Sequence, residues 1–257
     1  MFVDTHTHLY AEEFALDRVK MLDEAFKSGV KKLIMPSISQ SSTELMWQLN
    51  KLYPSNIYMM MGLHPCYVKT DSWKSELEWV ELQLQSGLYC AVGEIGIDLY
   101  WDKSTLAIQQ EAFRIQIKWA IEYDLPINIH CREAFNEVFE ILEEMRNPKL
   151  RGVFHCFTGT EEQAWQAIDL QMKLGIGGVV TFKNGLLDSF LHRINPTNLV
   201  LETDAPYLAP VPYRGKRNES AYIPLIAKKL AEIYNMTIEE IAQITSEQAL
   251  KLFGLED

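Results

Sequence analysis

The feature that most constrains this chain is a strand-type segment that recurs eight times, followed in most cases by a polar turn and a helix-type segment. Such alternation implies that parallel strands pair through right-handed helical crossovers. The predicted strands are Phe2–Thr5, Lys32–Pro36, Tyr58–Leu63, Tyr89–Glu94, Pro126–His130, Arg151–His155, Leu174–Gly178 and Asn198–Thr203. Eight such units favour a closed (β/α)8 barrel of the TIM type, although an open doubly wound sheet would give a similar pattern.

Helix start and stop signals lie between these segments. A Ser or Thr followed three residues later by Glu or Gln is typical of a helix N-terminus. Such capping boxes are predicted at Ser41–Glu44, Thr160–Gln163 and Thr237–Glu240. The last helix is expected to end near Gly254, because glycine commonly terminates helices.

The chain has 257 residues, which suits one barrel of about 250 residues. We therefore expect residues 1–257 to form a single domain. The sequence contains no run of about 18 apolar residues and no secretory signal, so we expect no membrane segment. Its four cysteines include no CxxC pair, which is typical of a reduced, cytoplasmic protein. Nothing in the sequence indicates an obligate protein partner.

Five of the six histidines stand at or just past the predicted carboxyl end of a strand, and two carboxylates occupy equivalent positions. These residues are His6, His8, His64, Glu94, His130, His155 and Asp204. In barrels of this type, catalytic residues gather at the carboxyl ends of the strands. Each residue alone is more simply explained as part of the core or a loop. Together they indicate a metal site.

The chemistry of this set favours two divalent ions. Imidazole combined with carboxylate suits transition metals, whereas a tetrahedral zinc needs only four ligands. A carboxylate can also bridge two ions about 3.5–4 Å apart, as in hydrolytic two-metal sites. The chain has no GxSxG motif and no convincing nucleophilic cysteine. We therefore expect two ions per subunit, drawn from Zn, Mg, Mn, Ni and Co, that activate a water molecule.

Two more acidic residues, Asp4 and Glu202, precede His6 and Asp204 by two positions. Strand alternation places each pair on the same face, which we expect to be the barrel interior. Metal-bound histidines usually donate their second N–H to a carboxylate, a carbonyl or water. We expect Asp4 or Glu202, or both, to orient ligands or to pair with an interior cation, for which Arg132 is one candidate.

The chain resembles the TatD family of metal-dependent hydrolases, within the wider amidohydrolase-like barrels, over nearly its whole length. The resemblance rests on DTHTHL at 4–9, GLHP at 62–65, GEIGID at 93–98, IHCREA at 129–134, FHCFTG at 154–159, GIGG at 175–178, ETDAPYLAP at 202–210 and GKRNES at 215–220. The family pattern usually has proline where this chain has Ser220, a difference that concerns the shape of a loop before a helix.

The resemblance implies a role for each candidate residue. One ion would be held by His6, His8, Glu94 and Asp204, and the second by Glu94, His130 and His155. Asp204 would also take a proton from the attacking water, and His64 would lie near the substrate phosphate. The implied activity is divalent-metal-dependent hydrolysis of phosphodiester bonds in DNA, often exonucleolytic.

A DNA substrate would need a local positive field, because the formal net charge of the chain is -11 and proteins that coat nucleic acid are usually basic. Arg132 could bind a phosphate bidentately or pair with Glu133 or another acid. Arg214, Lys216 and Arg217 form a small basic cluster that is either a solvated loop or a DNA contact.

Two other functions compete with DNA hydrolysis. The same barrel could hydrolyse an amide, a lactone or an aminoacyl ester, such as aminoacyl-tRNA, because the metal chemistry is shared. A non-catalytic binding protein is a third interpretation, and the intact ligand set argues against it.

Overall fold

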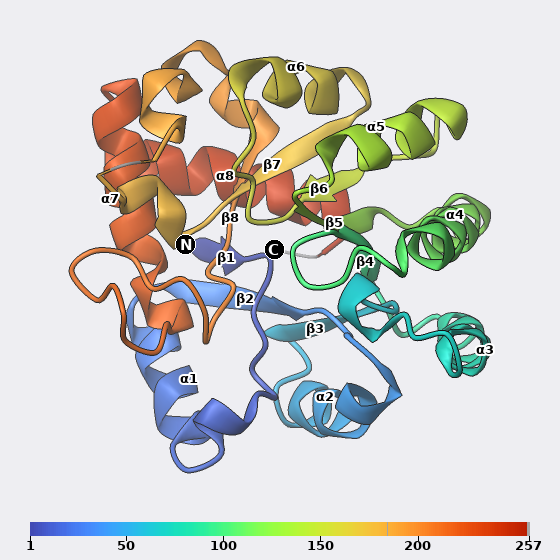
Figure 1. Ribbon diagram of the computed structural model, residues 1–257. Helices are drawn as coiled ribbons and strands as arrows, with labels where there is room; N and C mark the ends of the chain where they lie inside the picture. The colour runs from blue at the N-terminus through green and yellow to red at the C-terminus, as the bar shows by residue number, and fades with distance from the viewer. Residues whose placement is uncertain (184, 256–257) are drawn as a thin grey trace.

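The computed structural model describes residues 1–183 and 185–255 (Figure 1). Its eight parallel strands pair in chain order. They are β1 (Phe2–Asp4), β2 (Val30–Met35), β3 (Ile57–Met61), β4 (Ala91–Asp98), β5 (Ile127–Arg132), β6 (Gly152–Phe154), β7 (Met172–Ile176) and β8 (Leu199–Leu201). The N–H of Thr5 donates to Leu201 O, and that of Asp204 to His6 O, so the first and last strands are joined. The predicted barrel is confirmed, and the open sheet is excluded.

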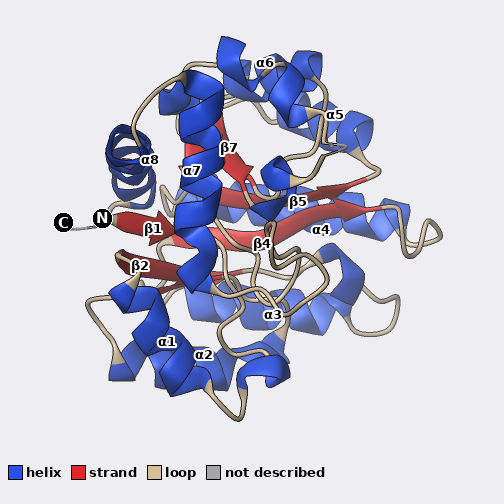
Figure 2. Ribbon diagram, turned by 90° about the vertical axis from the view of Figure 1, so that its left-hand side faces the viewer, coloured by secondary structure: helices blue, strands red, loops and turns tan. Residues whose placement is uncertain are grey.

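Helices surround the strands (Figure 2). They are α1 (Arg18–Lys27), α2 (Gln40–Leu52), α3 (Trp73–Leu84), α4 (Leu106–Glu122), α5 (Phe135–Glu144), α6 (Glu161–Asp169), α7 (Ile223–Tyr234) and α8 (Ile238–Phe253). Short 3-10 turns are η1 (Glu12–Phe14), η2 (Pro65–Tyr67), η3 (Gly178–Thr181), η4 (Leu187–Ser189), η5 (Leu191–Arg193), η6 (Pro196–Asn198) and η7 (Ser220–Tyr222). None of the helices in the described part of the chain is long and apolar enough to cross a membrane.

The capping predictions have mixed outcomes. Thr160 and Thr237 both form the expected capping boxes, and Gly254 ends α8 with a left-handed φ of 62°. The box predicted at Ser41 is wrong, because α2 begins at Gln40 and Ser41 lies within its first turn. There the hydroxyl of Ser41 lies 2.8 Å from that of Ser39.

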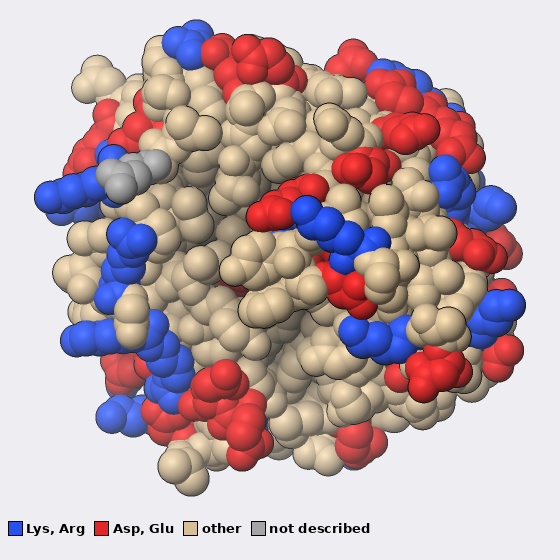
Figure 3. Space-filling view, viewed as in Figure 1, with Lys and Arg blue, Asp and Glu red and all other residues tan. Residues whose placement is uncertain are grey.

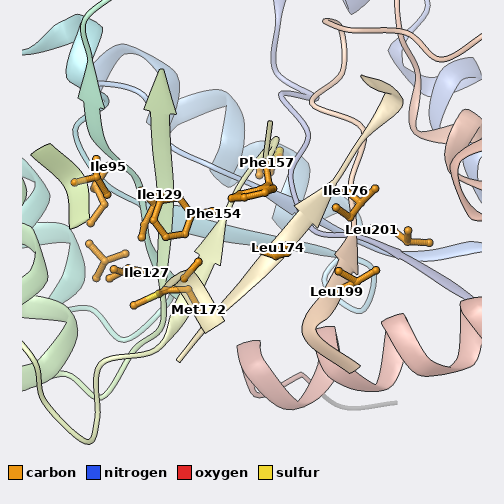
Figure 4. Close-up of a cluster of buried hydrophobic side chains, with 14 of the residues drawn as sticks. Ile95, Ile127, Ile129, Phe154, Phe157, Met172, Leu174, Ile176, Leu199 and Leu201 are labelled. Atoms are coloured by element: carbon orange, nitrogen blue, oxygen red, sulfur yellow. The ribbon is translucent and has the colours of Figure 1, made fainter. Parts of the chain in front are cut away.

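The outer face of the strands packs against the helices. In β5, Ile127 and Ile129 point outward and are fully buried, and they belong to the same core as Phe154 of β6 (Figure 4). Asn128 and His130 alternate with them and therefore face the barrel interior. This alternation places apolar side chains between the strands and the helices, and polar side chains inside the barrel near the carboxyl ends of the strands.

The end of the barrel at which the strands begin is closed by a group of apolar side chains that we call the floor. It comprises Val3, Ile34, Met60, Ala91, Val153 and Val200 from six strands, with Ala249, Leu252 and Phe253 from α8. Side chains from so many strands can meet only inside the barrel. Figure 2 shows α8 at the left, at the end where the strands begin.

Strand β4 departs from the sequence prediction. It was expected to end at Glu94, but it continues to Asp98, with a shift in register just before Ile95. Gly96 has a φ of +138°, and a Cβ there would lie 2.0 Å from the carbonyl oxygen of His130. Glycine thus lets β4 and β5 stay paired beyond Glu94, which lies in mid-strand rather than at a strand end.

Candidate metal centre

The strands end at a face that is hollowed near its centre (Figure 3). The hollow has a volume of about 780 Å³. Its lining includes His8, His64, Glu94, His130, His155 and Asp204, which the sequence singled out. His6 is fully buried beside them. The structure therefore brings together all seven residues that were selected by their position at strand ends.

The first group of ligand atoms consists of Nε2 of His6, Nε2 of His8, Oε2 of Glu94 and Oδ1 of Asp204. His6 Nε2 lies 3.3 Å from the His8 and Glu94 atoms and 3.7 Å from Asp204 Oδ1. His8 Nε2 lies 3.3 Å from Asp204 Oδ1 and 3.8 Å from Glu94 Oε2. Ligands about 2.1 Å from a tetrahedral ion lie about 3.4 Å from one another. The spacing therefore fits a single ion.

The second group surrounds the other oxygen of Glu94. Oε1 of Glu94 lies 2.9 Å from Nδ1 of His130, 2.9 Å from Nε2 of His155 and 3.2 Å from Nε2 of His64. His130 Nδ1 also lies 3.4 Å from His155 Nε2. Each oxygen of the Glu94 carboxylate thus faces a different set of nitrogens, which is the arrangement a bridging ligand requires.

Hydrogen bonds of the remaining ring nitrogens show which nitrogens are free to bind metal. Nδ1 of His6 donates to Oδ1 of Asn128 at 2.9 Å. Nδ1 of His8 donates to the Tyr10 hydroxyl at 2.7 Å, and that hydroxyl donates onward to Pro36 O at 2.8 Å. Both histidines therefore keep Nε2 unprotonated and directed at the first group.

Each of the other two histidines has a carboxylate beside its second ring nitrogen, although in the described residues only His130 makes a hydrogen bond to it. Nε2 of His130 donates to Oδ2 of Asp98 at 2.9 Å, which leaves Nδ1 for a metal. Burial raises the pKa of Asp98, but hydrogen bonds from His130 and from backbone N–H groups outweigh it and lower that pKa to about 2. Nδ1 of His155 lies 3.7 Å from Oε1 of Glu202, so the facing carboxylate favours a proton on Nδ1 and frees Nε2.

His64 has the opposite orientation. Its Nδ1 accepts the backbone N–H of Cys66 at 3.0 Å, so a neutral ring carries its proton on Nε2. Burial lowers the pKa of His64 to about 4, although the facing Glu94 carboxylate acts in the other direction. His64 is therefore neutral at neutral pH and presents a donor, rather than a ligand, to the second group.

The buried Glu94 carboxylate fits a role in metal binding. Burial raises its pKa, but the surrounding imidazoles outweigh this and hold the pKa well below its usual range. Within residues 1–183 and 185–255, its Oε2 has no hydrogen-bond partner. A buried carboxylate oxygen without a hydrogen bond is costly unless it binds a cation. The donor set and its spacing thus fit two divalent ions.

Glu202 lies inside the barrel, as the sequence predicted. It is fully buried, and its Oε1 accepts the backbone N–H of Cys156. A Cβ at position 175 would lie 2.3 Å from Oε2 of Glu202, so only glycine leaves room for this carboxylate. Glu202 is in place to hold the ring of His155.

Asp4 is buried, but the prediction that it faces the barrel interior is wrong. Val3 packs in the floor, so strand alternation turns the next residue, Asp4, toward the helix layer. Strand β1 ends at Asp4 and the chain bends at Thr5, so the alternation does not extend to His6. Its carboxylate accepts the N–H of Thr203 at 2.9 Å, the hydroxyl of Thr203 at 2.6 Å and the backbone N–H of His6 at 3.4 Å. Burial raises its pKa to about 7, against hydrogen bonds from Thr203 and Ser220. Asp4 supports backbone rather than an imidazole.

Arg132 lines the hollow without an acidic partner. Its guanidinium lies 3.7 Å from the centroid of the Tyr100 ring. Within the described ranges its side chain makes no hydrogen bond or ion pair, and Glu133 lies 4.0 Å from Lys103 instead. An ion pair of Arg132 with Glu133, or with an interior carboxylate, is therefore wrong for this structure. Its N–H donors face the hollow.

The basic cluster after β8 is only partly free. Arg217 donates to both carboxylate oxygens of Asp17 at 2.7 Å and to Glu219 at 2.8 Å, which makes it a structural residue. The guanidinium of Arg214 lies 4.5 Å from the Phe182 ring centroid. Lys and Arg side chains gather along the left edge of the hollowed face in Figure 3.

Comparison with known proteins agrees with the geometry of the candidate metal centre. The TatD related DNase family matches residues 3–254. This chain belongs to the TatD family. A Bacillus subtilis relative, described as the uncharacterized metal-dependent hydrolase YabD, is 38% identical over 256 residues, which is 99% of this chain and 100% of that protein.

Two further proteins are similar to this TatD family member over nearly their whole length. The Pantoea ananatis protein named 3'-5' ssDNA/RNA exonuclease TatD is 31% identical over 260 residues, covering 98% of this chain and 99% of that one. The crystal structure of YjjV, a TatD homolog from Escherichia coli K12, superposes with a TM-score of 0.91 at 29% identity, covering 99% and 98% of the two chains. This TatD protein is a metal-dependent hydrolase.

Ser220 stands where the TatD pattern usually has proline. It begins η7 and is fully buried. Its hydroxyl lies 3.2 Å from that of Thr7, which follows β1. Serine thus adds a hydrogen bond between this loop and the first strand, which proline could not make.

Sequence reasoning missed three residues that orient ligands: Tyr10, Asp98 and Asn128. Asn128 precedes His130 by two residues in the same strand, so the alternation that was applied to Glu202 would have found it. Tyr10 follows His8 by two residues. Asp98 was hidden because β4 was expected to end at Glu94.

Proposed function

We propose that this protein is a two-metal phosphodiesterase that acts on DNA, in the manner of an exonuclease. The observation that carries the proposal is the Glu94 carboxylate, whose two oxygens face separate groups of metal-binding nitrogens. When bound, the two ions would lower the pKa of a water and offset charge on the phosphate. His6, His8, Glu94 and Asp204 would hold one ion, and Glu94, His130 and His155 the other.

Asp204 is the proposed base. Burial raises its pKa, but the hydrogen bond from His8 and the charges of nearby imidazoles outweigh this and lower the pKa below its usual value. The carboxylate is therefore ionised at neutral pH and able to accept a proton from the attacking water. It lines the hollow, where a substrate can reach it.

His64 and Arg132 supply donors for the substrate. The Nε2–H of His64 points toward the second ligand group, so it can donate to a phosphate oxygen placed there. The guanidinium of Arg132 is held on Tyr100 with its donors unpaired in the described ranges. A planar guanidinium matches the oxygens of a phosphate. These donors favour a phosphodiester over an amide, a lactone or an aminoacyl ester.

The test is a substrate panel with metal-reconstituted protein. End-labelled single-stranded DNA, duplex DNA, RNA and an aminoacyl ester are incubated with the protein loaded with Zn, Mg, Mn, Ni or Co. We expect stepwise shortening of DNA that stops on chelation and returns with a divalent ion. Turnover that persists in excess chelator, with no metal bound, would overturn the two-metal proposal. Cleavage of the ester alone would overturn the choice of substrate.

A further inference from the structure

We propose that Trp101, beside Tyr100, is a substrate-binding residue whose ring stacks on the base next to the bond that is cleaved. Both aromatic residues lie in the loop between β4 and α4. The inference rests on the proposed function and names a further residue that positions the substrate at the same site.

The two aromatic side chains are unusually exposed. Trp101 is 69% exposed and Tyr100 is 50% exposed. Trp101 lines the same hollow as His130 and Asp204. Large aromatic rings are normally buried, so an exposed pair beside a concave site indicates a binding surface.

One carboxylate ties this loop to the metal centre. Oδ1 of Asp98 accepts the backbone N–H of Tyr100 at 3.0 Å and that of Trp101 at 3.1 Å. Oδ2 of the same residue accepts Nε2–H of His130. The position of the aromatic pair is therefore fixed relative to a proposed metal ligand, although the rings themselves are exposed.

The neighbouring Arg132 side chain packs more closely on one of the two rings than on the other. Arg132 covers one face of Tyr100 at 3.7 Å and lies 5.6 Å from the Trp101 ring. The rings of Tyr100 and Trp101 meet edge to face, at 87° and 4.9 Å. Arg132 thus packs more closely on Tyr100 than on Trp101, and Trp101 is the more exposed of the two rings. A phosphate on Arg132 would bring the base of the same nucleotide within reach of Trp101.

Other aromatic residues of the hollow are placed differently. Tyr67 stands edge-on to His64 at 86°, and Tyr207 is steeply tilted to His8 at 68°. Both rings therefore lie directly beside histidines of the proposed metal-binding groups. Single-stranded nucleic acid is typically bound by aromatic stacking next to cationic contacts. Trp101 and Arg132 lie side by side in the hollow and offer this combination.

The inference is tested with Trp101→Ala and Trp101→Phe in the metal-loaded protein, with Trp165→Ala as control. Trp165 lies on α6, is 45% exposed and does not line the hollow. The substrates are a single-stranded DNA oligonucleotide and the same strand with abasic residues at the cleaved end. Stacking on an aromatic ring contributes about 1–3 kcal/mol per base, so Trp101→Ala should raise KM about 5- to 150-fold. We expect kcat within about two-fold of wild type.

Two features separate stacking from a merely structural role. Trp101→Phe should restore most of the lost affinity, and the abasic strand should be cleaved alike by wild type and Trp101→Ala. A KM for Trp101→Ala within about two-fold of wild type, or an equal loss on the abasic strand, would overturn this inference and leave the proposed function intact. Failure of wild type to cleave any oligonucleotide would overturn both.

Discussion

The two ends of the barrel are built from the same strands and hold opposite kinds of side chain. In β6, Val153 lies in the floor, and His155, two residues further along the chain, reaches the candidate metal centre. In β8, Val200 lies in the floor and Glu202 above it. Interior positions therefore change from apolar to ionisable within one step of the strand alternation.

The difference shows how burial is stabilised at each end. The floor needs only close packing against α8, because aliphatic side chains gain free energy when they leave water. The metal centre buries carboxylates and imidazoles, which are stable there only when each finds a partner. We therefore expect substitutions at the metal centre to affect metal binding and catalysis, and substitutions in the floor to affect the free energy of unfolding.

The largest expected effect is a loss of kcat at the candidate metal centre. Asp204→Asn should lower kcat by about 10²–10⁴-fold, because an amide cannot accept the proton of the attacking water. Its midpoint of thermal unfolding should stay close to that of wild type, and Asp169→Asn on α6 is the control. Activity of Asp204→Asn within a few-fold of wild type would mean that another group is the base.

Phe253→Ala, in the floor, should have the opposite effect: it should lower the free energy of unfolding and leave kcat unchanged. Phe253 is 4% exposed and packs inside the barrel end. Truncation of a buried phenylalanine costs about 3–5 kcal/mol, to be measured by urea unfolding. The kcat of the folded variant should match wild type. A large loss of kcat without loss of stability would show that the two ends are coupled.

Glu202→Gln tests the layer between the two ends. The amide oxygen can still accept the N–H of Cys156, but the charge facing His155 is lost. Removing such a partner typically costs 10–100-fold in metal affinity or activity. Metal affinity is measured by competition with a chromophoric chelator. Unchanged affinity would show that Glu202 does not orient His155.

Arg132→Ala separates substrate binding from metal binding. Hydrogen bonds to charged groups contribute about 1.5–3 kcal/mol, so KM for DNA should rise about ten-fold or more. Metal content, measured by atomic emission, should be unchanged, because the Arg132 side chain makes no hydrogen bond or ion pair with a proposed ligand in the described ranges. Parallel loss of metal and activity would indicate a structural role instead.

The smallest effect is expected at the cap of α8. Thr237→Ala removes two side-chain hydrogen bonds to Glu240 from a capping box and should cost about 1 kcal/mol of unfolding free energy. Thr160→Ala removes the corresponding bond from the N–H of Gln163 in α6 and should cost a similar amount. A loss of activity in Thr237→Ala beyond that in Thr160→Ala would show that the floor influences the candidate metal centre.

Local signals predicted much of this protein. The strand and helix alternation indicated the barrel, and the strand-end rule selected His6, His8, His130, His155 and Asp204. Two capping boxes were correct because their hydrogen bonds lie within four residues. The box at Ser41 failed because Ser39, two residues earlier, is the residue that precedes the helix.

Other features depended on neighbours that are distant in sequence. The length of β4 depends on Gly96, which packs against the backbone of β5. The direction of Asp4 relative to His6 depends on where β1 ends, because the strand stops at Asp4 and the chain bends at Thr5. Neither feature has a signature in the residues around it, because strand pairing is set by the neighbouring strand and by the packing of both faces.

The sequence by itself determined which chemical groups this protein carries to the carboxyl ends of its strands, because strand alternation is a local and periodic property. The tertiary structure decided the state of the groups whose partners are distant in the chain. The proton on His64 is placed by the nearby Cys66, whereas that on His130 is placed by Asp98 from another strand. A ring nitrogen becomes a ligand or a donor according to what its other nitrogen contacts, and for His130 that contact forms only when β4 and β5 pair.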